Sequence, residues 1–406
     1  MNIRNVLEKM IAARASDLHL KAGTPPVVRV DGVLYTLDEA PPTSPDLREV
    51  TNQLLNEEQR LYFSTHSEID FAFGVSGLAR FRANIFMQRG TPALALRHVP
   101  VEVPSIEDLN MPAVVKDLAF ATRGLVLVTG RTGSGKSTTL AAMIDAINKV
   151  TSRNVITVED PIEFLHRDQM SYVHQREVGL DTHSFKDGLR YVLRQDPDII
   201  LVGEIRDLET MSSALMAADT GHLVMSTLHT TDVVQTLQRI VSFYPPHQHE
   251  EVRLSIASNL RAVICQRLIP RADGAGRAPA VEIMVNTPTI REYILNPDKT
   301  ALIGAVVAEG TSQYGMQTFD QSVMQLLREG MITEEEALKN CTNANEFALK
   351  LKGISATSDR LWQAVDAASG EESASIPGIM PTRPPGGGAG RVVRPPMPPN
   401  RPRRAA

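Results

Sequence analysis

The feature that most constrains this chain is a glycine-rich loop between an apolar run and a helical pattern. Residues 130–137 read Gly-Arg-Thr-Gly-Ser-Gly-Lys-Ser; they follow the apolar run 125–128 and precede helical spacing over 138–150. In such a strand–loop–helix unit, the glycines let backbone amides wrap a phosphate at the start of the helix. The loop therefore predicts an α/β fold that binds a nucleoside triphosphate, and this context disfavours a glycine-rich turn without a ligand.

The same loop supplies the expected contacts to the ligand. Lys136 is expected to reach the β- and γ-phosphates, and the Ser137 hydroxyl is expected to ligate Mg²⁺. The predicted nucleotide-binding residues are Gly130, Thr132, Gly133, Ser134, Gly135, Lys136, Ser137 and Thr138.

The composition is that of a mostly globular protein of two or three domains. The chain has 406 residues, of which 42% are hydrophobic, and a formal net charge of −5. Six arginines and no acidic residue follow Glu372, so the rest of the chain is more acidic than the total suggests. An acidic body and 5% aromatic content disfavour a nucleic-acid translocase, which usually carries a basic surface.

Cysteine usage and hydropathy indicate a cytoplasmic protein. Cys265 and Cys341 are far apart and form no Cys-x-x-Cys pair, so the sequence predicts neither a zinc ribbon nor a disulfide framework. Two free thiols suit a reducing cytosol. No apolar run approaches the roughly 18 residues of a membrane span, and the charged residues 1–14 lack the core of a signal peptide.

The first part of the chain predicts a small α+β domain over residues 1–100. Asp31-Gly32 suits the tight turn of a β-hairpin between two short apolar runs. Helical spacing is expected at 2–14, 46–55 and 57–65, and strands at 27–30, 33–35, 68–73, 78–87 and 93–98. These short alternating runs favour an antiparallel sheet. Prolines then punctuate an expected linker over 101–115.

The second part predicts an α/β domain over residues 116–355. Continuous apolar runs are found at 124–129, 154–159, 198–203 and 222–228. Such runs, spaced by helices, indicate a buried parallel sheet. Helices are expected to dominate residues 231–352, with Thr318 and Thr333 as N-caps and Gly330 and Gly353 as stops. Residues 370–406 are rich in Pro, Gly and Arg, and we expect a disordered tail.

Polar residues follow these apolar strands, at the sheet edge where open parallel sheets bind ligands. Glu204 ends the run 198–203 in the position of an acid that holds Mg²⁺ directly or through water. Gly203 stands where many phosphate-loop enzymes carry Asp, so one carboxylate must serve the metal. An exposed strand-end carboxylate is the alternative.

Hydrolysis also needs a water oriented toward the γ-phosphate. Glu163 is the candidate base, because Pro161 turns the chain and aims it back over the site. Glu159 and Asp160 are rivals, and a solvated acidic loop is the alternative. His229, just past its strand, is a candidate sensor of the γ-phosphate through a hydrogen bond.

The spacing of two histidines disfavours a shared metal site. His222 and His229 are seven residues apart, which places them on opposite faces of one strand, so we do not expect them to bind one metal ion. His222 is expected to brace the sheet.

Three arginines of the first domain are candidates for a contact with the nucleotide. Arg80 and Arg82 share one face of a strand, and Arg97 lies on the next strand. An arginine near the developing charge assists phosphoryl transfer, so we expect nucleotide between the two domains. Ordinary surface charge is the alternative.

These motifs, found together and in this order, resemble those of the secretion ATPase superfamily. Besides the phosphate loop, the matching stretches are 155–163, 194–207 and 220–230, which look like the Asp box, Walker B and His box of that superfamily. Within it, the chain is similar to the PilT family of type IV pilus retraction ATPases. The likeness extends from Ser16-Asp17-Leu18-His19-Leu20 to about residue 352 and includes 315–320.

The resemblance implies a PAS-like first domain, a RecA-like second domain and a homohexameric ring. It implies Mg²⁺-dependent ATP hydrolysis that powers pilus retraction, with the inner-membrane pilus platform as a partner, peripheral membrane placement and no nucleic acid. It assigns Lys136 and Ser137 to nucleotide and metal, Glu204 to the Walker B acid, Glu163 to the general base, and Arg82 and Arg97 to charge stabilisation.

Two features that are absent and three departures from the family pattern bear on which branch of the family this chain resembles. The family's pilus-assembly and type II secretion relatives usually carry an additional N-terminal region and a four-cysteine module; this sequence has neither, which favours retraction. Arg131 replaces a common proline, 289–295 only partly matches the retraction segment, and the tail is foreign to the family. An accessory paralogue or a related secretion ATPase stays open, as does a nucleotide-sensing module without turnover.

Overall fold

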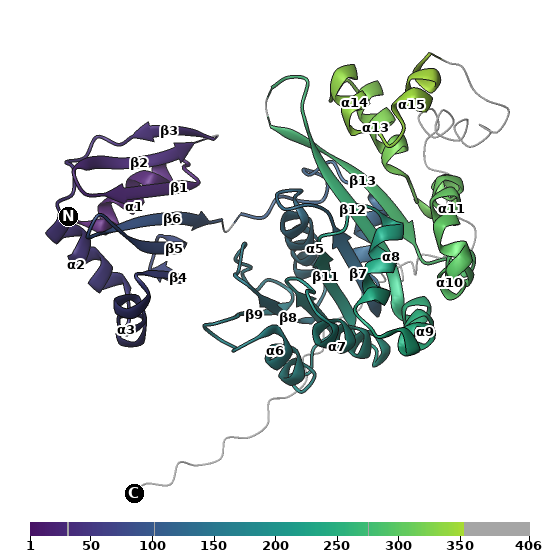
Figure 1. Ribbon diagram of the computed structural model, residues 1–406, viewed down its shortest axis with the longest axis horizontal. Coiled ribbons are helices and arrows are strands. Elements are labelled where there is room, and N and C mark those ends of the chain that lie inside the picture. The colour runs from purple at the N-terminus through teal and green to yellow at the C-terminus, as the bar shows by residue number, and fades with distance from the viewer. Residues whose placement is uncertain (31, 101, 275, 353–406) are drawn as a thin grey trace, which may run out of the picture.

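The computed structural model describes residues 1–30, 32–100, 102–274 and 276–352. The expectations for the tail over 370–406 and for a stop at Gly353 concern residues outside this part. The described chain forms a small N-terminal domain and a larger α/β domain, each built on its own sheet (Figure 1). The expected combination of an antiparallel first sheet with a parallel-rich second sheet is confirmed.

Over the described residues, the N-terminal domain contains a six-stranded antiparallel sheet with the strand order β3-β2-β1-β6-β5-β4. Its elements are α1 (Ile3–Ala12), β1 (Asp17–Lys21), β2 (Thr24–Val30), β3 (Val33–Thr36), α2 (Ser44–Leu54), α3 (Glu57–His66), β4 (Glu68–Val75), β5 (Ala79–Gln88) and β6 (Thr91–Val99). Phe81 and Ile85 of β5 are buried against α1 and α2, while Arg80 and Arg82 alternate onto the other face. The arginines of this strand therefore face away from the core of their own domain.

The larger domain contains a seven-stranded sheet in the order β13-β12-β7-β11-β10-β8-β9, counted over the described chain. Its strands are β7 (Gly124–Thr129), β8 (Asn154–Glu159), β9 (Tyr172–Glu177), β10 (Ile199–Val202), β11 (Leu223–Leu228), β12 (Leu260–Pro270) and β13 (Arg277–Val285). Neighbouring strands are parallel except for the β12–β13 hairpin. The strands expected at 124–129, 154–159, 198–203 and 222–228 are confirmed, and their carboxyl ends meet at one edge.

Helices cover both faces of this sheet. They are α4 (Ala113–Ala119), α5 (Lys136–Val150), α6 (Phe185–Val192), α7 (Leu208–Asp219), α8 (Val233–Ser242), η1 (Pro246–Gln248), α9 (His249–Asn259), α10 (Pro288–Leu295), η2 (Pro297–Leu302), α11 (Ile303–Glu309), α12 (Thr311–Tyr314), α13 (Phe319–Arg328), α14 (Glu334–Asn340) and α15 (Ala344–Leu351). Val126 and Val128 of β7 pack toward α4 and α5, whereas Leu125 and Leu127 pack toward α7, α8 and α9. Burial on both faces explains why these strands are continuously apolar.

The prediction that helices dominate residues 231–352 is wrong over 260–285, where β12 and β13 form a hairpin. Charged residues interrupt both strands, so their alternation is weak in sequence. The edge strand β9 was also not expected, because Tyr172–Glu177 is largely polar. The N-caps at Thr318 and Thr333 are confirmed, and Gly330 has the positive φ of a stop.

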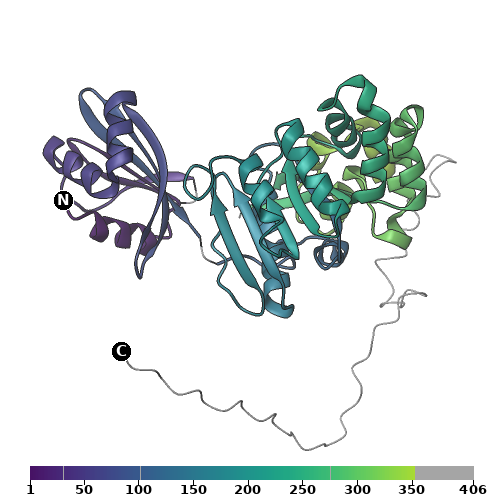
Figure 2. The ribbon, with the colours of Figure 1, turned by 90° about the horizontal axis from the view of Figure 1, so that it is seen from below.

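The two domains lie beside each other at the β8–β9 edge of the large sheet, and the C-terminal helices α10–α15 lie at the far side, beyond β13 (Figures 1 and 2). Helix α4 begins at Ala113, so residues 113–115 of the expected linker are helical. This arrangement leaves the carboxyl edge of the parallel strands next to the N-terminal domain.

Candidate functional site

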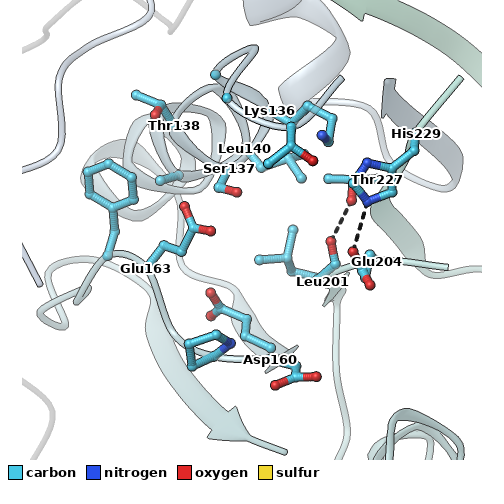
Figure 3. A pocket seen from close by; sticks show the side chains of 18 of the residues that line it. Lys136, Ser137, Thr138, Leu140, Asp160, Glu163, Leu201, Glu204, Thr227 and His229 are labelled. Carbon is cyan, nitrogen blue, oxygen red and sulfur yellow. Dashed lines mark hydrogen bonds and ion pairs between the residues drawn. The ribbon is translucent and has the colours of Figure 1, made fainter. Parts of the chain in front are cut away.

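A cavity of about 590 Å³ lies where the carboxyl ends of β7, β8, β10 and β11 meet. The parallel register places Thr129 beside Leu228 and Val158 beside Val202, so the segments that follow these strands converge. The cavity brings together most of the expected site residues: Thr132, Gly133, Gly135, Lys136, Ser137, Thr138, Glu163, Glu204, His229 and Arg97. Figure 3 labels Lys136, Ser137, Thr138, Glu163, Glu204 and His229 among them.

The phosphate loop has a shape that only glycine allows. Gly130 and Gly135 have φ values of +145° and +90°. A Cβ on Gly130 would collide with the Gln266 carbonyl oxygen, and one on Gly135 would lie 2.8 Å from the Gln266 side-chain nitrogen. Ser134 Oγ is buried and finds no hydrogen-bond partner within the described chain. Gly130 and Ser134 therefore shape the loop from behind, while Gly133 and Gly135 line the cavity.

Lys136 is buried at the start of α5 and turned into its own loop. Its Nζ donates hydrogen bonds to the carbonyl oxygens of Gly130 at 2.9 Å and Arg131 at 3.2 Å. Burial lowers the pKa of Lys136, and the nearby Glu163 carboxylate opposes that shift. A phosphate oxygen carries negative charge and therefore attracts this ammonium more strongly than the neutral carbonyl oxygens that hold it here.

Glu204 and His229 form a pair across the sheet edge. His229 Nε2 lies 3.1 Å from Glu204 Oε2, and Arg206 forms an ion pair with the same carboxylate. Burial, followed by the positive charges of Lys136 and Arg206, lowers the pKa of His229. A neutral imidazole is therefore favoured near neutral pH, and it keeps one ring nitrogen free to accept a hydrogen bond.

His222 lies at the other end of the same strand. Its Nδ1 lies 2.9 Å from the carbonyl oxygen of Ala217 and 3.1 Å from Thr220 Oγ1. These contacts tie the end of α7 to the start of β11, and His222 does not line the cavity.

Two of the candidate acids at the carboxyl end of β8, Glu159 and Glu163, have different surroundings. Glu159 accepts hydrogen bonds from Thr157 Oγ1 at 2.6 Å and Gln175 Nε2 at 3.1 Å, and burial raises its pKa. Its carboxylate is thus held at the sheet. Glu163 is exposed and points into the cavity on the side of Ser137 (Figure 3). Glu163 is the acid of this segment whose position suits an attacking water.

Two arginines of the N-terminal domain, Arg97 and Arg82, also differ in their position relative to the cavity. Arg97 lines the nucleotide-sized cavity, and its Nε donates to Asp17 Oδ1 at 2.8 Å. Burial raises the pKa of Asp17, but hydrogen bonds from Ser16 and Arg97 outweigh this effect and hold the pKa below its usual value. Arg82, opposite Arg97 in register, lines a neighbouring cavity of about 290 Å³ instead. The structure brings Arg97 to the main cavity and leaves Arg82 outside it.

Several residues that line the cavity were not expected from the sequence. Arg206 follows Glu204 by two residues and lies within the stretch 194–207, so its place beside Glu204 in the sequence is the signal that could have identified it. Arg277 donates from Nη1 to the Gly133 carbonyl oxygen at 3.3 Å. It begins β13, a strand read as helical, so no signal pointed to it. Phe164, Phe185 and Leu268 add apolar walls.

Over residues 2–309 the chain matches the family described as "Type II/IV secretion system protein". The chain belongs to this family. Within it the chain is a PilT-family type IV pilus ATPase, because relatives of that group match over most of its length.

The relatives are as follows. The chain is 45% identical to "Type IV pilus retractation ATPase PilT" of Pseudomonas aeruginosa over 86% of this chain and all of the relative. It is 40% identical to "Type IV pilus ATPase PilU" of the same organism over 89% of this chain and 94% of the relative. A "Twitching motility protein" of Neisseria gonorrhoeae is 42% identical over 80% of this chain and 86% of the relative.

Solved structures support the same assignment. "Crystal Structure of the Pilus Retraction Motor PilT and Bound ADP" has a TM-score of 0.79 at 43% identity and covers 85% of this chain and 98% of that one. The Legionella pneumophila ATPase DotB has a TM-score of 0.69 at 28% identity, over 86% of this chain and 95% of that one. The chain is thus an ATPase of the PilT family, with an ATP-binding site. None of the helices described here is long and apolar enough to cross a bilayer.

The residues of this ATPase fit a metal that arrives with the nucleotide. The described chain contains no group of three or more His, Cys, Asp and Glu side chains arranged to hold a metal ion. Mg²⁺ usually takes one or two protein ligands and completes its shell with phosphate oxygens and water. The Ser137 hydroxyl and the Glu204 carboxylate, both on the cavity wall, are oxygen donors of this kind.

Proposed function

We propose that this ATPase powers pilus retraction by hydrolysing Mg²⁺-bound ATP in the cavity between the phosphate loop and Arg97. The observation that carries the proposal is the convergence of the loop, Glu163, Glu204 and His229 with an arginine of the other domain on one cavity. A site with walls from two domains can convert the loss of a phosphate into a change of domain position.

Each side chain has a role in this proposal that its surroundings support. Lys136 would bind the β- and γ-phosphates, and the Ser137 hydroxyl and the Glu204 carboxylate would hold Mg²⁺. When bound, Mg²⁺ would neutralise part of the negative charge of the phosphates. Glu204 also fixes the His229 ring, whose free nitrogen is available to a γ-phosphate or to water.

Glu163 orients the attacking water and accepts its proton, because its exposed carboxylate points into the cavity. Arg97 stabilises charge on the transferred phosphoryl group, since it lines the same cavity from the N-terminal domain. Arg82 is placed to assist only if the domains move relative to one another.

Mechanical work requires that copies act on each other. We expect six copies to close a ring through heterologous contacts, since such contacts form rings when the rotation closes. ATP would hold the two domains together, and hydrolysis would release them in turn around the ring. The partners would be the platform protein of a pilus machine and its pilins, with the ring at the cytoplasmic face of the inner membrane.

An accessory motor that supports a principal retraction ATPase is the second candidate. Two observations favour it: the 40% identity to PilU over 94% of that relative, and the partial match of 289–295 to the retraction segment.

The test is deletion of the gene in its source cell, complemented with wild type or with Glu163→Gln. Excess surface pili with lost twitching, restored by wild type and not by Glu163→Gln, is the expected result. Purified Glu163→Gln should lose about 10²- to 10⁴-fold in kcat while still binding nucleotide. Normal pili after deletion would assign the accessory role, and undiminished turnover in Lys136→Ala and Glu163→Gln would refute the proposed site.

A further inference from the structure

The contacts between the two domains end beside Glu163. Arg80 of β5 donates from Nη2 to Glu177 Oε2 of β9 at 3.0 Å. The Leu165 amide donates to the Pro100 carbonyl oxygen, just after β6, at 3.2 Å. One contact therefore reaches the strand that packs against the Glu163 segment, and the other reaches that segment itself.

Glu177 connects the first contact to the backbone next to Glu163. Its side chain is 6% exposed, and the same Oε2 atom that binds Arg80 also accepts the Ile162 amide at 3.2 Å. Asp181 Oδ2 accepts the amide of Glu177 at 2.9 Å and fixes this end of β9. A single carboxylate oxygen thus joins a guanidinium of the N-terminal domain to the residue that precedes Glu163.

The rest of the Glu163 segment is held by the same face of β9. Gln175, two residues before Glu177, donates to the Phe164 carbonyl oxygen at 2.8 Å and accepts the His166 amide at 2.8 Å. Residues i and i+2 of a strand point to one side. Gln175 acts within the large domain alone, whereas Glu177 also reaches the N-terminal domain, so of these two side chains only Glu177 loses a contact when the domains separate.

We propose that Glu177 is a positioning residue that places Glu163 for hydrolysis only when Arg80 of the N-terminal domain is docked on it. The inference rests on the proposed role of Glu163 as the base. A buried carboxylate is stable when a cation and hydrogen bonds neutralise it and costly when it is left unpaired.

Withdrawal of Arg80 therefore favours movement of the Glu177 carboxylate toward water. The cavity of about 290 Å³ that Glu177 lines with Arg82 and Pro161 provides space for this movement. The Ile162 amide then loses its acceptor, and Glu163 loses its fixed position. Hydrolysis is thereby coupled to domain closure, and a subunit whose domains are apart does not hydrolyse ATP efficiently.

The test compares Arg80→Ala, Glu177→Gln and the double variant in steady-state ATPase assays with Mg²⁺. We expect kcat to fall at least about fivefold in each single variant, within the usual range for coupling between two elements. KM and the Kd of a fluorescent ADP analogue should stay within about twofold of wild type, since neither residue lines the nucleotide cavity. The double variant should be no slower than the slower single variant. Arg80→Lys should recover part of the loss.

Arg153→Ala is the matched control. Arg153 Nη1 lies 3.2 Å from Asp198 Oδ1, and Asp198 Oδ2 accepts the Asn154 amide at 2.8 Å. This contact also joins an arginine, a carboxylate and a backbone amide, but it is more exposed, uses both carboxylate oxygens, and lies within one domain at the amino ends of the strands. Arg153→Ala should keep wild-type kcat.

The outcomes separate this inference from the proposed function. Wild-type kcat in Arg80→Ala and Glu177→Gln, alongside an inactive Glu163→Gln, would overturn the coupling and leave the base assignment intact. Losses that multiply in the double variant would also overturn it. Normal turnover in Glu163→Gln would instead remove the proposed base. Arg80 is on the surface of its domain, so Arg80→Ala alone decides the question if Glu177→Gln misfolds.

Discussion

Arg82 and Arg97 lie directly opposite each other on β5 and β6 and both line the smaller neighbouring cavity, yet only Arg97 also lines the nucleotide cavity. Arg97 is held by Asp17, whose low pKa keeps it ionised and keeps the guanidinium oriented near neutral pH. An oriented guanidinium costs less free energy to use in a transition state than a free one, because its position is already fixed. The two arginines should therefore contribute unequally to catalysis.

We predict that Arg97→Ala lowers kcat by about 10²-fold or more, toward the range for arginines that stabilise phosphoryl transfer. Arg82→Ala should lower it less than about tenfold. Initial rates of phosphate release by the purified variants, at saturating ATP and Mg²⁺, give the comparison. Arg97→Lys serves as a control for charge alone and should stay well below wild type, because an ammonium lacks the planar fork. Equal losses in Arg82→Ala and Arg97→Ala would contradict the assignment.

At the scale of the element, a buried carboxylate joins β13 to the start of α8. Glu282 Oε2 accepts the Val233 amide at 2.9 Å, and Glu282 pairs across the hairpin with Cys265. Burial, with a contribution from the charge of Asp232, raises the pKa of Glu282 to about 7, while the Val233 amide and Arg267 oppose this shift. Helix α8 follows the loop that carries His229, so this contact fixes one side of the site.

The raised pKa predicts that Glu282 destabilises the fold as pH rises. The folded protein binds the proton more tightly than the unfolded chain, whose carboxyl has a value near 4.5, so stability falls between about pH 4.5 and pH 7. Glu282→Gln removes this titration and keeps an acceptor for Val233. In urea unfolding, the free energy of unfolding of the variant relative to wild type should increase from about pH 5 to about pH 8, by at most about 3 kcal/mol. A difference that does not change with pH would refute the prediction.

The elements that the sequence predicted are those with one strong period or a motif. β7 and β11 are apolar on both faces, and the phosphate loop fixes where β7 ends, so the edge that carries Lys136 and His229 was predictable. β9 is a polar edge strand with no such signal. Gln175 and Glu177, which hold the Glu163 segment, were therefore not identified before the structure was known.

Contacts between domains were beyond the sequence for a different reason. Arg80 and Arg82 share one face of β5, and no pattern distinguishes which of them, or Arg97, reaches the phosphate loop. That distinction depends on how two sheets are docked, which local periodicity does not encode. Likewise, the choice of Glu163 over Glu159 depends on Gln175, a residue on another strand.

At the scale of the whole molecule, the nucleotide cavity lies between two domains that, over the described residues, are joined by polar contacts such as the Arg80–Glu177 ion pair and the hydrogen bond from Leu165 to Pro100. The N-terminal domain lies at the β8–β9 edge, and the helices beyond β13 lie far from it (Figures 1 and 2). Small, polar interfaces within a chain usually permit domain motion. ATP, with groups on both sides of the seam, should therefore favour the closed arrangement.

We predict that spin labels on α3 and α6 report this closure. The labels are attached at Leu61→Cys and Tyr191→Cys, because these side chains are 69% and 50% exposed. The Cys341→Ser substitution removes one native thiol. The other, Cys265, is buried, and burial raises its pKa well above that of a free thiol, so it should not react with the label. Double electron–electron resonance, with labelled chains diluted by unlabelled ones, should give a narrow distance with Mg²⁺ and a non-hydrolysable ATP analogue. ADP should broaden it, and Lys136→Ala should respond to neither nucleotide. Identical distributions in both nucleotides would show that the seam does not move, and the link between hydrolysis and work would have to lie elsewhere in the chain.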